Sequence, residues 1–483
     1  MRTLVWFRGK DLRVSDHEPL TSAVETSRGE GDVVLLFVLD PFFFSREAAA
    51  EMPHRMQFLL ESLTSLAENL AHLGGTLLVV PGKSYEKVPE VARALAVERV
   101  VAQAWTEPFG RERDRRVRER LSVPFELMEG ERLAPHGTLR TGQGHPFSVY
   151  TPFSRAFARD VRPCAPRRAP KALPPLGPGL TRAASKLGLR AIPTLEELGL
   201  RRNPGLVEGG ERAARARLTA FVESRIAAYA DARDLLAAAG TSRLSQDLKF
   251  GTLSPRQVWA AAASSVGPGA DTFRRELVWR EFAHHILDAR PDVLERPFKR
   301  SFEGFPYVDD PRGWEAWITG KTGYPVVDAA ARELLATGYV HNRARMIAAS
   351  FLTKHLRISY RAGEAHYMKY LTDGDWAQND AGWQWSSGSG CDAQPYFRVF
   401  APVTQGEKFD ADGAYVKRWV PELAKLDARH VHAPWEAPPL ALRAAGIDLG
   451  KTYPFPIVDH AKARDTFLSV AKAYFGSEGP PRS

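Results

Sequence analysis

The hydrophobic pattern changes along the chain, and this change limits the possible folds more than any other feature of the sequence. Four short apolar runs alternate with amphipathic segments in the first third of the chain, at residues 3–7, 33–39, 76–80 and 99–104. Apolar runs of this length, rich in β-branched residues, are typical of buried strands. Strands that alternate with helices predict a doubly wound parallel sheet. We therefore expect an α/β domain over residues 1–130.

Residues 131–204 have a different character, and we interpret them as an interdomain linker. Within them, the stretch 161–181 is too rich in proline to form a helix or a central strand, because proline lacks a backbone donor and clashes with the preceding turn. The chain is expected to leave one domain here and to enter a second.

After about residue 205 the strand signal nearly disappears, and helical periodicity takes its place. Apolar residues recur at helical spacing in six segments, at 211–230, 255–265, 272–289, 326–337, 343–355 and 363–371. A length of 483 residues alone would suggest about three domains. The pattern instead predicts two, the α/β domain and a larger helical domain over residues 205–475.

The composition limits where the chain is expected to act. Two cysteines, Cys164 and Cys391, cannot form a disulfide framework and lack metal-site spacing, so we expect a reducing compartment. No apolar run approaches the roughly 20 residues that a membrane helix requires, and the N-terminus lacks the apolar stretch of a signal peptide. We expect a cytoplasmic protein with no membrane partner. The formal net charge of +9 is compatible with a polyanionic partner.

Several familiar motifs are absent from the sequence. There is no GxGxxG fingerprint and no GxxxxGK[ST] loop, so any nucleotide must be held in another way. The histidines have no HExxH or CxxC context, and Asp373-Gly374-Asp375 does not match the ligand positions of a calcium loop. We therefore predict no metal site. A GxSxG elbow is also missing, which leaves no basis for a Ser-His-Asp triad.

Hydroxyl side chains gather in residues 241–245, Thr-Ser-Arg-Leu-Ser, directly before a predicted helix. Free backbone N–H groups and the helix dipole favour an anion at such a position, so this stretch suits a phosphate. The alternative is that a serine or threonine simply caps the helix. Taken alone, the sequence favours capping.

Glu276, Trp279 and Arg280 lie at positions i, i+3 and i+4, which places them on one face of a predicted helix. An acid, an indole and a guanidinium make a poor core face, so the three are candidates for ligand binding. The alternative is a solvated helix edge with one half-buried tryptophan.

Asn342 and Met346 share a second helical face, with Arg343 and Arg345 beside them in the sequence. An amide, a thioether and two arginines suit a cleft for a ligand that is partly apolar and partly anionic. For each residue taken singly, a methionine in the core and arginines on the surface are the favoured interpretation.

The densest concentration of unusual residues lies between residues 370 and 390. Trp376, Trp383 and Trp385 fall within ten positions, in a chain that has 11 tryptophans in all. Glycine and serine around them let a planar ligand approach the backbone closely. We favour ligand binding here over structural packing alone.

Together these segments resemble the DNA photolyase/cryptochrome family, and within it the cyclobutane pyrimidine dimer photolyases. The family's fold, an α/β antenna domain followed by a helical flavin domain, agrees with the two-domain prediction. The implied activity is light-driven DNA repair, in which reduced FAD gives an electron to the dimer, the cyclobutane ring splits and the electron returns. The matching stretches cover nearly the whole chain in the family's order, at 6–13, 240–245, 279–282, 321–328, 341–346, 373–375, 382–385 and 392–398.

The resemblance implies that FAD is bound, reduced and anionic when active. Residues 241–245 match the stretch that holds the FAD diphosphate, and Asn379 matches the asparagine that faces flavin N5. Arg345 and Asp373 match the pair that flanks the isoalloxazine. The full set of implied FAD-binding residues is Tyr229, Thr241, Ser242, Arg243, Leu244, Ser245, Arg345, Asp373, Gly374, Asp375 and Asn379.

The resemblance also implies a pocket for a thymine dimer that is flipped out of DNA. A lesion with disrupted stacking costs less to flip than a normal base, and indoles can stack on it. Glu276 would donate a hydrogen bond to the dimer radical anion, which requires that its carboxyl holds or shares a proton. The implied substrate and DNA-binding residues are Arg233, Glu276, Trp279, Arg280, Asn342, Arg343, Met346 and Trp385.

The sequence departs from the family in its electron-transfer residues. Family members commonly photoreduce FAD through three tryptophans, and Trp383 matches the one nearest the flavin. The middle and outer positions align with Tyr360 and Tyr307. Because tyrosine oxidation is coupled to loss of the phenolic proton, we expect photoreduction to be weaker than repair. Possible substitutes are Trp376, Trp314 and Trp317.

The antenna chromophore is a separate question. Folate-binding family members carry an Asn-Glu pair where this chain has Phe109-Gly110. This segment, together with Lys249, looks more like members that bind a deazaflavin. We therefore expect a deazaflavin rather than a folate, with FMN or an empty site as further alternatives.

Two related functions stay open as alternatives. A (6-4) photolyase would have a histidine where Met346 stands, so Met346 favours the dimer enzyme. A cryptochrome photoreceptor would bind FAD and signal without repairing, and the set Glu276, Trp279, Asn342 and Met346 favours repair over this alternative. A plain basic nucleic-acid-binding module does not account for the tryptophan-rich segment. We expect a monomer that acts on DNA containing pyrimidine dimers.

Overall fold

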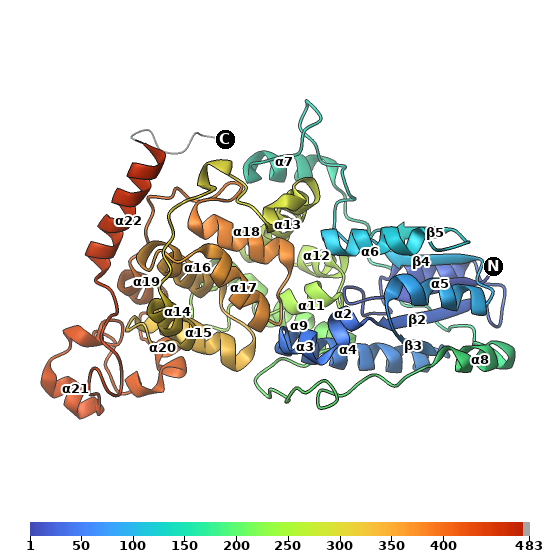
Figure 1. Ribbon diagram of the computed structural model, residues 1–483, viewed down its shortest axis with the longest axis horizontal. Helices are drawn as coiled ribbons and strands as arrows, with labels where there is room; N and C mark the ends of the chain where they lie inside the picture. The colour runs from blue at the N-terminus through green and yellow to red at the C-terminus, as the bar shows by residue number, and fades with distance from the viewer. Residues whose placement is uncertain (477–483) are drawn as a thin grey trace. The chain divides into compact units, whose positions relative to one another are not determined.

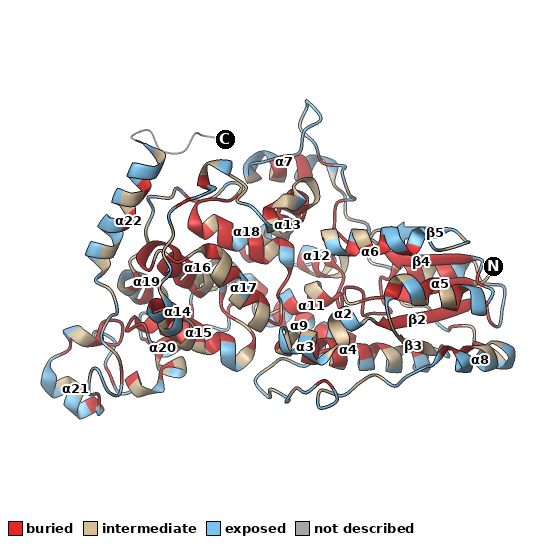
Figure 2. Ribbon diagram, in the orientation of Figure 1, coloured by how far each residue is buried: buried red, intermediate tan, exposed pale blue. Residues whose placement is uncertain are grey.

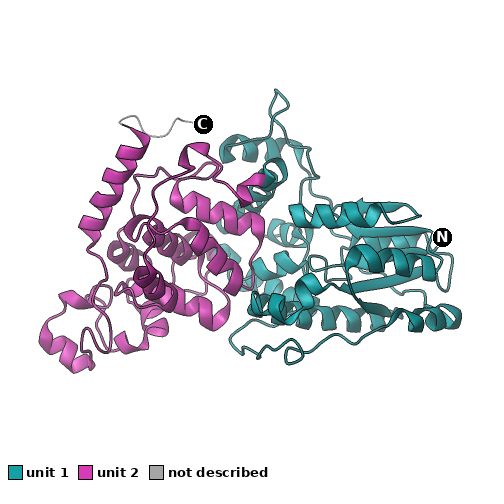
Figure 3. Ribbon diagram, viewed as in Figure 1, with its two compact units in different colours: residues 1–227, 242–291 teal, residues 228–241, 292–483 magenta. Residues whose placement is uncertain are grey.

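The computed structural model describes residues 1–476, which divide into two compact units (Figure 3). Unit 1 comprises residues 1–227 and 242–291, and unit 2 comprises residues 228–241 and the described chain from 292 onward. The chain therefore passes from unit 1 to unit 2 and back before it enters unit 2 for good. No helix within residues 1–476 is both long and apolar enough to cross a bilayer.

Unit 1 is built on a parallel five-stranded sheet with the strand order β3-β2-β1-β4-β5. The order places β1 in the centre, where Thr3 is in register with Val33 on one side and with Arg99 on the other. Every residue of β1 and β2 is buried, as expected for strands covered on both faces (Figure 2). The strands are β1 Thr3–Phe7, β2 Val33–Leu39, β3 Leu77–Pro81, β4 Arg99–Gln103 and β5 Phe125–Met128.

Helices cover both faces of this sheet (Figure 1). Alternate strand residues such as Val5 and Leu35 pack on one side against α1 (Glu18–Glu25) and α4 (Pro53–His72). Residues of opposite parity pack on the other side against α5 (Ser84–Ala94), α6 (Pro108–Arg118) and α8 (Pro178–Ala184). The predicted doubly wound α/β fold is confirmed. The sequence analysis did not predict β5, a short edge strand.

The proline-rich stretch contains more regular structure than the sequence suggested. Residues 178–181 belong to helix α8, although no helix was expected between 161 and 181. Proline is tolerated at the first helical position because its missing N–H has no partner there in any helix. Leu173 and Leu176 of the same stretch are buried against the two sides of the sheet. Helix α7 (Tyr150–Asp160) precedes the stretch.

The remaining helices of unit 1 form a second layer of the unit. They comprise two short helices, α2 (Pro41–Phe44) and α3 (Arg46–Ala50), and four helices at or after residue 211: α9 (Glu211–Ser224), α11 (Ser245–Phe250), α12 (Pro255–Ala263) and α13 (Pro268–Ala289). Helix α13 is the longest of them and carries the stripe Glu276, Trp279 and Arg280.

Unit 2 is helical, and its described residues contain no strand beyond one isolated bridge between Leu449 and Tyr453. Helices α15, α16, α17 and α18 pack together around one apolar core (Figure 1). This arrangement confirms the predicted helical domain. The helices are α10 Tyr229–Ala232, α14 Pro311–Thr319, α15 Pro325–Thr337, α16 Asn342–Ser350, α17 Tyr360–Tyr370, α18 Trp376–Ser387, α19 Pro402–Phe409, α20 Ala414–Trp419, α21 Pro439–Ala445 and α22 His460–Phe475.

Candidate functional site

An ion pair links α16 to the loop before α18 in unit 2. The Arg345 guanidinium donates to both carboxylate oxygens of Asp373, at 3.1 and 2.8 Å, and its Nε donates to the Val340 carbonyl at 2.7 Å. Arg345 also lies 5.7 Å from the centre of the Tyr339 ring. The sequence analysis predicted Arg345 and Asp373 as one functional pair, and the structure brings them together.

Thr241 joins this group through Tyr339. The hydroxyl oxygens of the two residues lie 3.4 Å apart. Thr241, Tyr339, Arg345 and Asp373 therefore form a continuous polar surface in unit 2. The sequence analysis missed Tyr339, because nothing in its local pattern distinguishes it from other tyrosines. Tyr229, another predicted FAD-binding residue of this unit, is buried at the start of α10.

Residues 242–245 lie in unit 1 and form the turn that leads into α11. Arg243 has a positive φ of 56°, an uncommon conformation for a residue other than glycine. The N-cap of α11 is Leu244, and no side chain forms a capping hydrogen bond. The capping alternative for this stretch is therefore wrong, since its serine and threonine hydroxyls do not cap the helix.

The start of α18 carries three of the predicted FAD-binding residues. Asp375 is the N-cap of α18 and accepts a hydrogen bond from the Gln378 backbone N–H at 3.2 Å. Gly374 and Asn379 are buried beside it. The Asn379 amide nitrogen donates to the Glu364 carbonyl at 3.1 Å, which fixes the orientation of the Asn379 side chain.

A buried carboxyl pair lies next to Asn379. Burial raises the pKa of both Glu364 and Asp380, and the charge of Glu364 raises the pKa of Asp380 further. Arg361 lies 3.1 Å from Glu364 and 3.8 Å from Asp380, which partly offsets these shifts. The pair can thus keep a proton close to Asn379. The sequence analysis missed both acids, although Asp380 directly follows Asn379.

This set of residues fits FAD. Within residues 1–476, the hydroxyl of Thr372 and that of Tyr367 are buried without a hydrogen-bond partner. Buried polar groups are normally paired, so unpaired hydroxyls one residue before Asp373 and in the adjoining helix α17 indicate a polar ligand. Arginine, carboxylate, amide and hydroxyl groups in one cluster match the mixture of anionic, ribityl and planar parts that FAD presents.

The predicted lesion-binding residues fall into two groups, one in each unit. In unit 1, Trp279 is 36% exposed, and its ring stacks on Tyr150 with the centroids 3.5 Å apart and an angle of 4° between the planes. The Tyr150 hydroxyl donates to the Arg275 carbonyl at 3.2 Å. Burial raises the pKa of Tyr150 to about 12, and the nearby charge of Glu276 adds to this shift.

Tyr150 is a further residue that the sequence analysis missed. It comes from α7, more than a hundred positions before Trp279, so no local pattern connects the two. Arg280, in contrast, is turned to the protein, because its guanidinium donates to the Glu131 carbonyl at 2.9 Å. Glu276, Trp279 and Tyr150 form one group of unit 1, and Arg280 is held in a separate internal contact.

In unit 2, the second group lies on α16. The Asn342 amide donates to the Met346 sulfur at 3.7 Å, and Asn342 is exposed. Arg343 forms an ion pair with Asp234 at 2.9 Å and lies over the ring of Phe409 at 4.4 Å. The predicted residues Arg233 and Trp385 are half-buried, at the end of α10 and on α18.

The predicted electron-transfer residues are all in unit 2. Trp383 is 3% exposed within α18, where Gly363 of α17 leaves room for its ring. Tyr360 is buried and Tyr307 is half-buried, and the centres of their rings are 6.5 Å apart. Of the possible substitutes, Trp317 is buried, Trp314 is half-buried and Trp376 is exposed.

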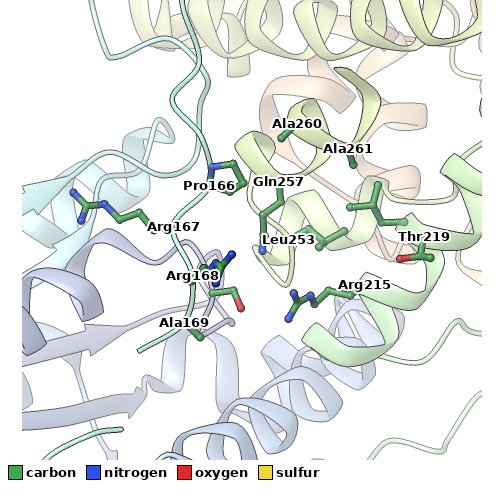
Figure 4. A pocket seen from close by; sticks show the side chains of 12 residues that line it. Pro166, Arg167, Arg168, Ala169, Arg215, Thr219, Leu253, Gln257, Ala260 and Ala261 are labelled. Atoms are coloured by element: carbon green, nitrogen blue, oxygen red, sulfur yellow. The ribbon is translucent and has the colours of Figure 1, made fainter. Parts of the chain in front are cut away.

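Unit 1 also contains an open pocket of about 650 Å³ whose lining includes none of the predicted site residues. Figure 4 shows its lining side chains, which come from residues 166–169, from α9 and from the segment around α12. Leu218, Leu253 and Ala260 provide apolar surface, and Arg168 and Arg215 are exposed at the pocket. It is separate from both groups of residues described above.

Comparison with known proteins agrees with this geometry. A family model described as DNA photolyase matches residues 3–174, and one described as the FAD binding domain of DNA photolyase matches residues 273–473. A deoxyribodipyrimidine photo-lyase of Thermus thermophilus is 44% identical over 87% of this chain and 92% of its own length.

Two solved structures have the same fold. A bacterial class III photolyase from Agrobacterium tumefaciens is 37% identical with a TM-score of 0.86, covering 98% of this chain and 97% of its own. A Synechocystis cryptochrome is 28% identical with a TM-score of 0.86, covering 97% of this chain and 99% of its own. The fold, the polar flavin-compatible cluster and these relatives lead to one conclusion: the chain belongs to the DNA photolyase family.

Proposed function

We propose that this chain is a light-driven lyase that splits cyclobutane pyrimidine dimers in DNA. One observation carries the proposal: Trp279 is held rigidly against Tyr150 with 36% of its surface exposed, close to Glu276 on the same helical face. A fixed, open indole next to a carboxyl group suits a flipped base, which needs a stacking surface and a hydrogen-bond partner at its edge.

FAD would be held by the chain's own polar groups. Arg345 and Asp373, paired at 2.8 Å, would orient the isoalloxazine, and Asn379 would face its N5. The turn 241–245 would hold the diphosphate through backbone N–H groups, hydroxyls and Arg243. When bound in its reduced anionic form, FAD supplies an electron that light makes available, while the protein orients it and limits competing reactions.

The lesion would be recognised from both sets of predicted residues. Trp279 stacks on the pyrimidine faces, and Asn342 with Met346 offers an exposed amide and thioether. Glu276 donates a hydrogen bond to a pyrimidine carbonyl, where negative charge develops as the dimer accepts the electron. Met346 also favours the dimer enzyme over a (6-4) photolyase, because the latter would have histidine at this position.

Arg233, Arg280 and Arg343 are proposed to contact DNA phosphates without reading sequence. Arg343 would have to share its guanidinium between Asp234 and a phosphate, and Arg280 would contribute through its remaining donors. Because phosphate contacts release counterions, binding should weaken as the salt concentration rises.

A deazaflavin is the antenna chromophore that the residues of unit 1 favour. A Cβ atom at Gly110 would lie 2.8 Å from the Trp105 ring, so the glutamate that folate-binding members carry here does not fit. Phe109 instead stacks on Phe42 at 4.3 Å, and both rings are exposed to a planar ligand. We also propose that the protein acts as a monomer in the cytoplasm, where its two free cysteines would stay reduced.

The test is to illuminate the dithionite-reduced protein with oligonucleotides that contain either a cyclobutane dimer or a (6-4) product, and to measure the repaired thymines. We expect repair of the first substrate only. Glu276→Ala should lower the repair quantum yield on the order of tenfold, because one donor to the developing charge is lost. Glu276→Gln keeps a donor and is the matched control. Absence of repair of either lesion would favour the cryptochrome alternative.

A further inference from the structure

Three tryptophans in unit 2 form an unbroken run of ring contacts. The ring centres of Trp383 and Trp317 are 6.0 Å apart, and Trp317 stacks on Trp314 at 5.6 Å with 23° between the planes. Trp383 and Trp317 are buried, whereas Trp314 is half-buried. The run thus leads from the interior of α18 to a residue of α14 that solvent reaches.

The two tyrosines at the family's usual electron-transfer positions do not form such a run. Tyr360 and Tyr307 contact each other at 6.5 Å, but no ring contact connects either of them with Trp383 in the described part of the chain. Trp376 is exposed and makes no ring contact within residues 1–476. Of the candidates that the sequence left open, only Trp317 and Trp314 are continuous with Trp383.

The surroundings of Tyr360 oppose its oxidation. A phenol that gives up an electron must also lose its proton, yet the Tyr360 hydroxyl is buried and forms no hydrogen bond of good geometry with the described residues. Burial raises its pKa far above the usual value. The Arg361 guanidinium lies 5.0 Å from the centre of the Tyr360 ring, and a fixed cation there disfavours a second positive charge.

The surroundings of the indoles are more favourable for positive charge. The Trp317 indole N–H donates to the Ala348 carbonyl at 3.1 Å, so the negative end of a dipole faces that ring. The His366 ring lies 5.7 Å from both Trp317 and Trp314. Burial lowers the pKa of His366 to about 4, with a smaller contribution from Lys369. The imidazole is therefore neutral at neutral pH and adds no charge beside the indoles.

We propose that Trp317 and Trp314, rather than Tyr360 and Tyr307, carry electrons to Trp383 when the bound flavin is photoreduced. The proposal rests on the proposed function, since it requires FAD beside Trp383. Light-excited oxidised flavin takes one electron from Trp383, which is refilled from Trp317, and Trp317 is refilled from Trp314. A thiol in solution then reduces Trp314. Each transfer moves one electron, and the oxidised Trp314 releases its indole proton to water and regains a proton on reduction.

The test uses the full chain with oxidised FAD bound and a thiol in excess. Transient absorption after a light flash distinguishes tryptophan radicals from tyrosine radicals, and steady illumination gives the rate of flavin reduction. Trp317→Phe and Trp314→Phe interrupt the proposed route, and Tyr360→Phe and Tyr307→Phe interrupt the competing one. Trp383→Phe defines the background, and Trp314→Phe decides the question alone if the buried Trp317→Phe change prevents folding.

We expect Trp317→Phe to lose the long-lived tryptophan radical and to photoreduce no faster than Trp383→Phe. Trp314→Phe should form a radical that decays before the thiol can reduce it. The proposal is overturned if the long-lived species is a tyrosine radical, or if Tyr360→Phe loses photoreduction while Trp314→Phe keeps it. Dimer repair by the dithionite-reduced unaltered chain is measured separately. Its failure would contradict the proposed function, while the radical spectra would still report the electron route.

Discussion

Unit 1 and unit 2 use aromatic side chains in opposite ways. In unit 1, Tyr150 and Trp279 stack face to face at 3.5 Å, and Trp279 remains 36% exposed. In unit 2, Trp383 and Trp317 are no more than 3% exposed, and their ring centres are 6.0 Å apart at an angle of 68°. The first pair presents a flat surface to solvent, whereas the second is enclosed by the helical core.

The difference shows how burial decides what an indole can do. An exposed, rigid ring gives binding area at little entropic cost, which suits recognition of a flipped base. An enclosed ring cannot touch DNA, but its environment is dry and fixed, which suits electron transfer. Changes in the enclosed group should therefore affect stability first, and changes in the exposed pair should affect affinity.

The largest effect is expected from Gly363→Ala. A Cβ atom at Gly363 would lie 2.2 Å from the Trp383 ring and 2.6 Å from Leu352, both of which are enclosed and cannot move freely. Overpacking of this kind should lower the free energy of unfolding by about 3 kcal/mol. Urea-induced unfolding, followed by tryptophan fluorescence and by circular dichroism, measures the change.

Gly382→Ala is the matched control, because Gly382 lies in the neighbouring helix α18 and a Cβ atom there meets nothing within 4 Å. Alanine favours the helix at such a position, so this variant should be at least as stable as the unaltered chain. If Gly363→Ala were equally stable, the Trp383 ring would not be enclosed as the structure shows.

The sequence predicted the fold well because the strands are short, apolar and separated by amphipathic helices. It missed β5, where Glu126 and Leu127 are exposed and the run is only four residues long. It did not identify α18 as a helix, because buried residues occur on nearly all sides of that helix and leave no amphipathic period.

The candidate site could be predicted where its residues form motifs and not where they meet only through folding. Arg345 and Asp373 were expected as a pair and form one. Tyr150 reaches Trp279 from a helix distant in sequence, so no spacing rule connects the two residues. The sequence could name Trp317 as a candidate, but its contact with Trp383 depends on the crossing of separate helices.

The next effect in size is expected from Trp279→Ala, which removes the open surface of unit 1. Stacking of a base on an aromatic ring contributes about 2 kcal/mol, so the affinity for dimer-containing DNA should fall about 30-fold. Unfolding should change little, because the ring is partly exposed. Fluorescence anisotropy with a labelled oligonucleotide measures the affinity, and Trp279→Phe, which keeps a ring, should lose less. An unchanged affinity for Trp279→Ala would contradict a stacking role.

The smallest effect is expected from Tyr150, which touches Trp279 rather than the lesion. Tyr150→Leu removes the stacked partner and should weaken binding of dimer-containing DNA by about 1 kcal/mol, or about fivefold, the value of an aromatic pair. Tyr150→Phe keeps the ring and loses only the hydrogen bond to the Arg275 carbonyl, so it should stay close to the unaltered protein. The repair yield per bound dimer should stay constant in both variants, because a positioning residue affects the affinity and not the later electron transfer. Equal losses for Tyr150→Phe and Tyr150→Leu would show that the hydroxyl, and not the stacked ring, holds Trp279 in place.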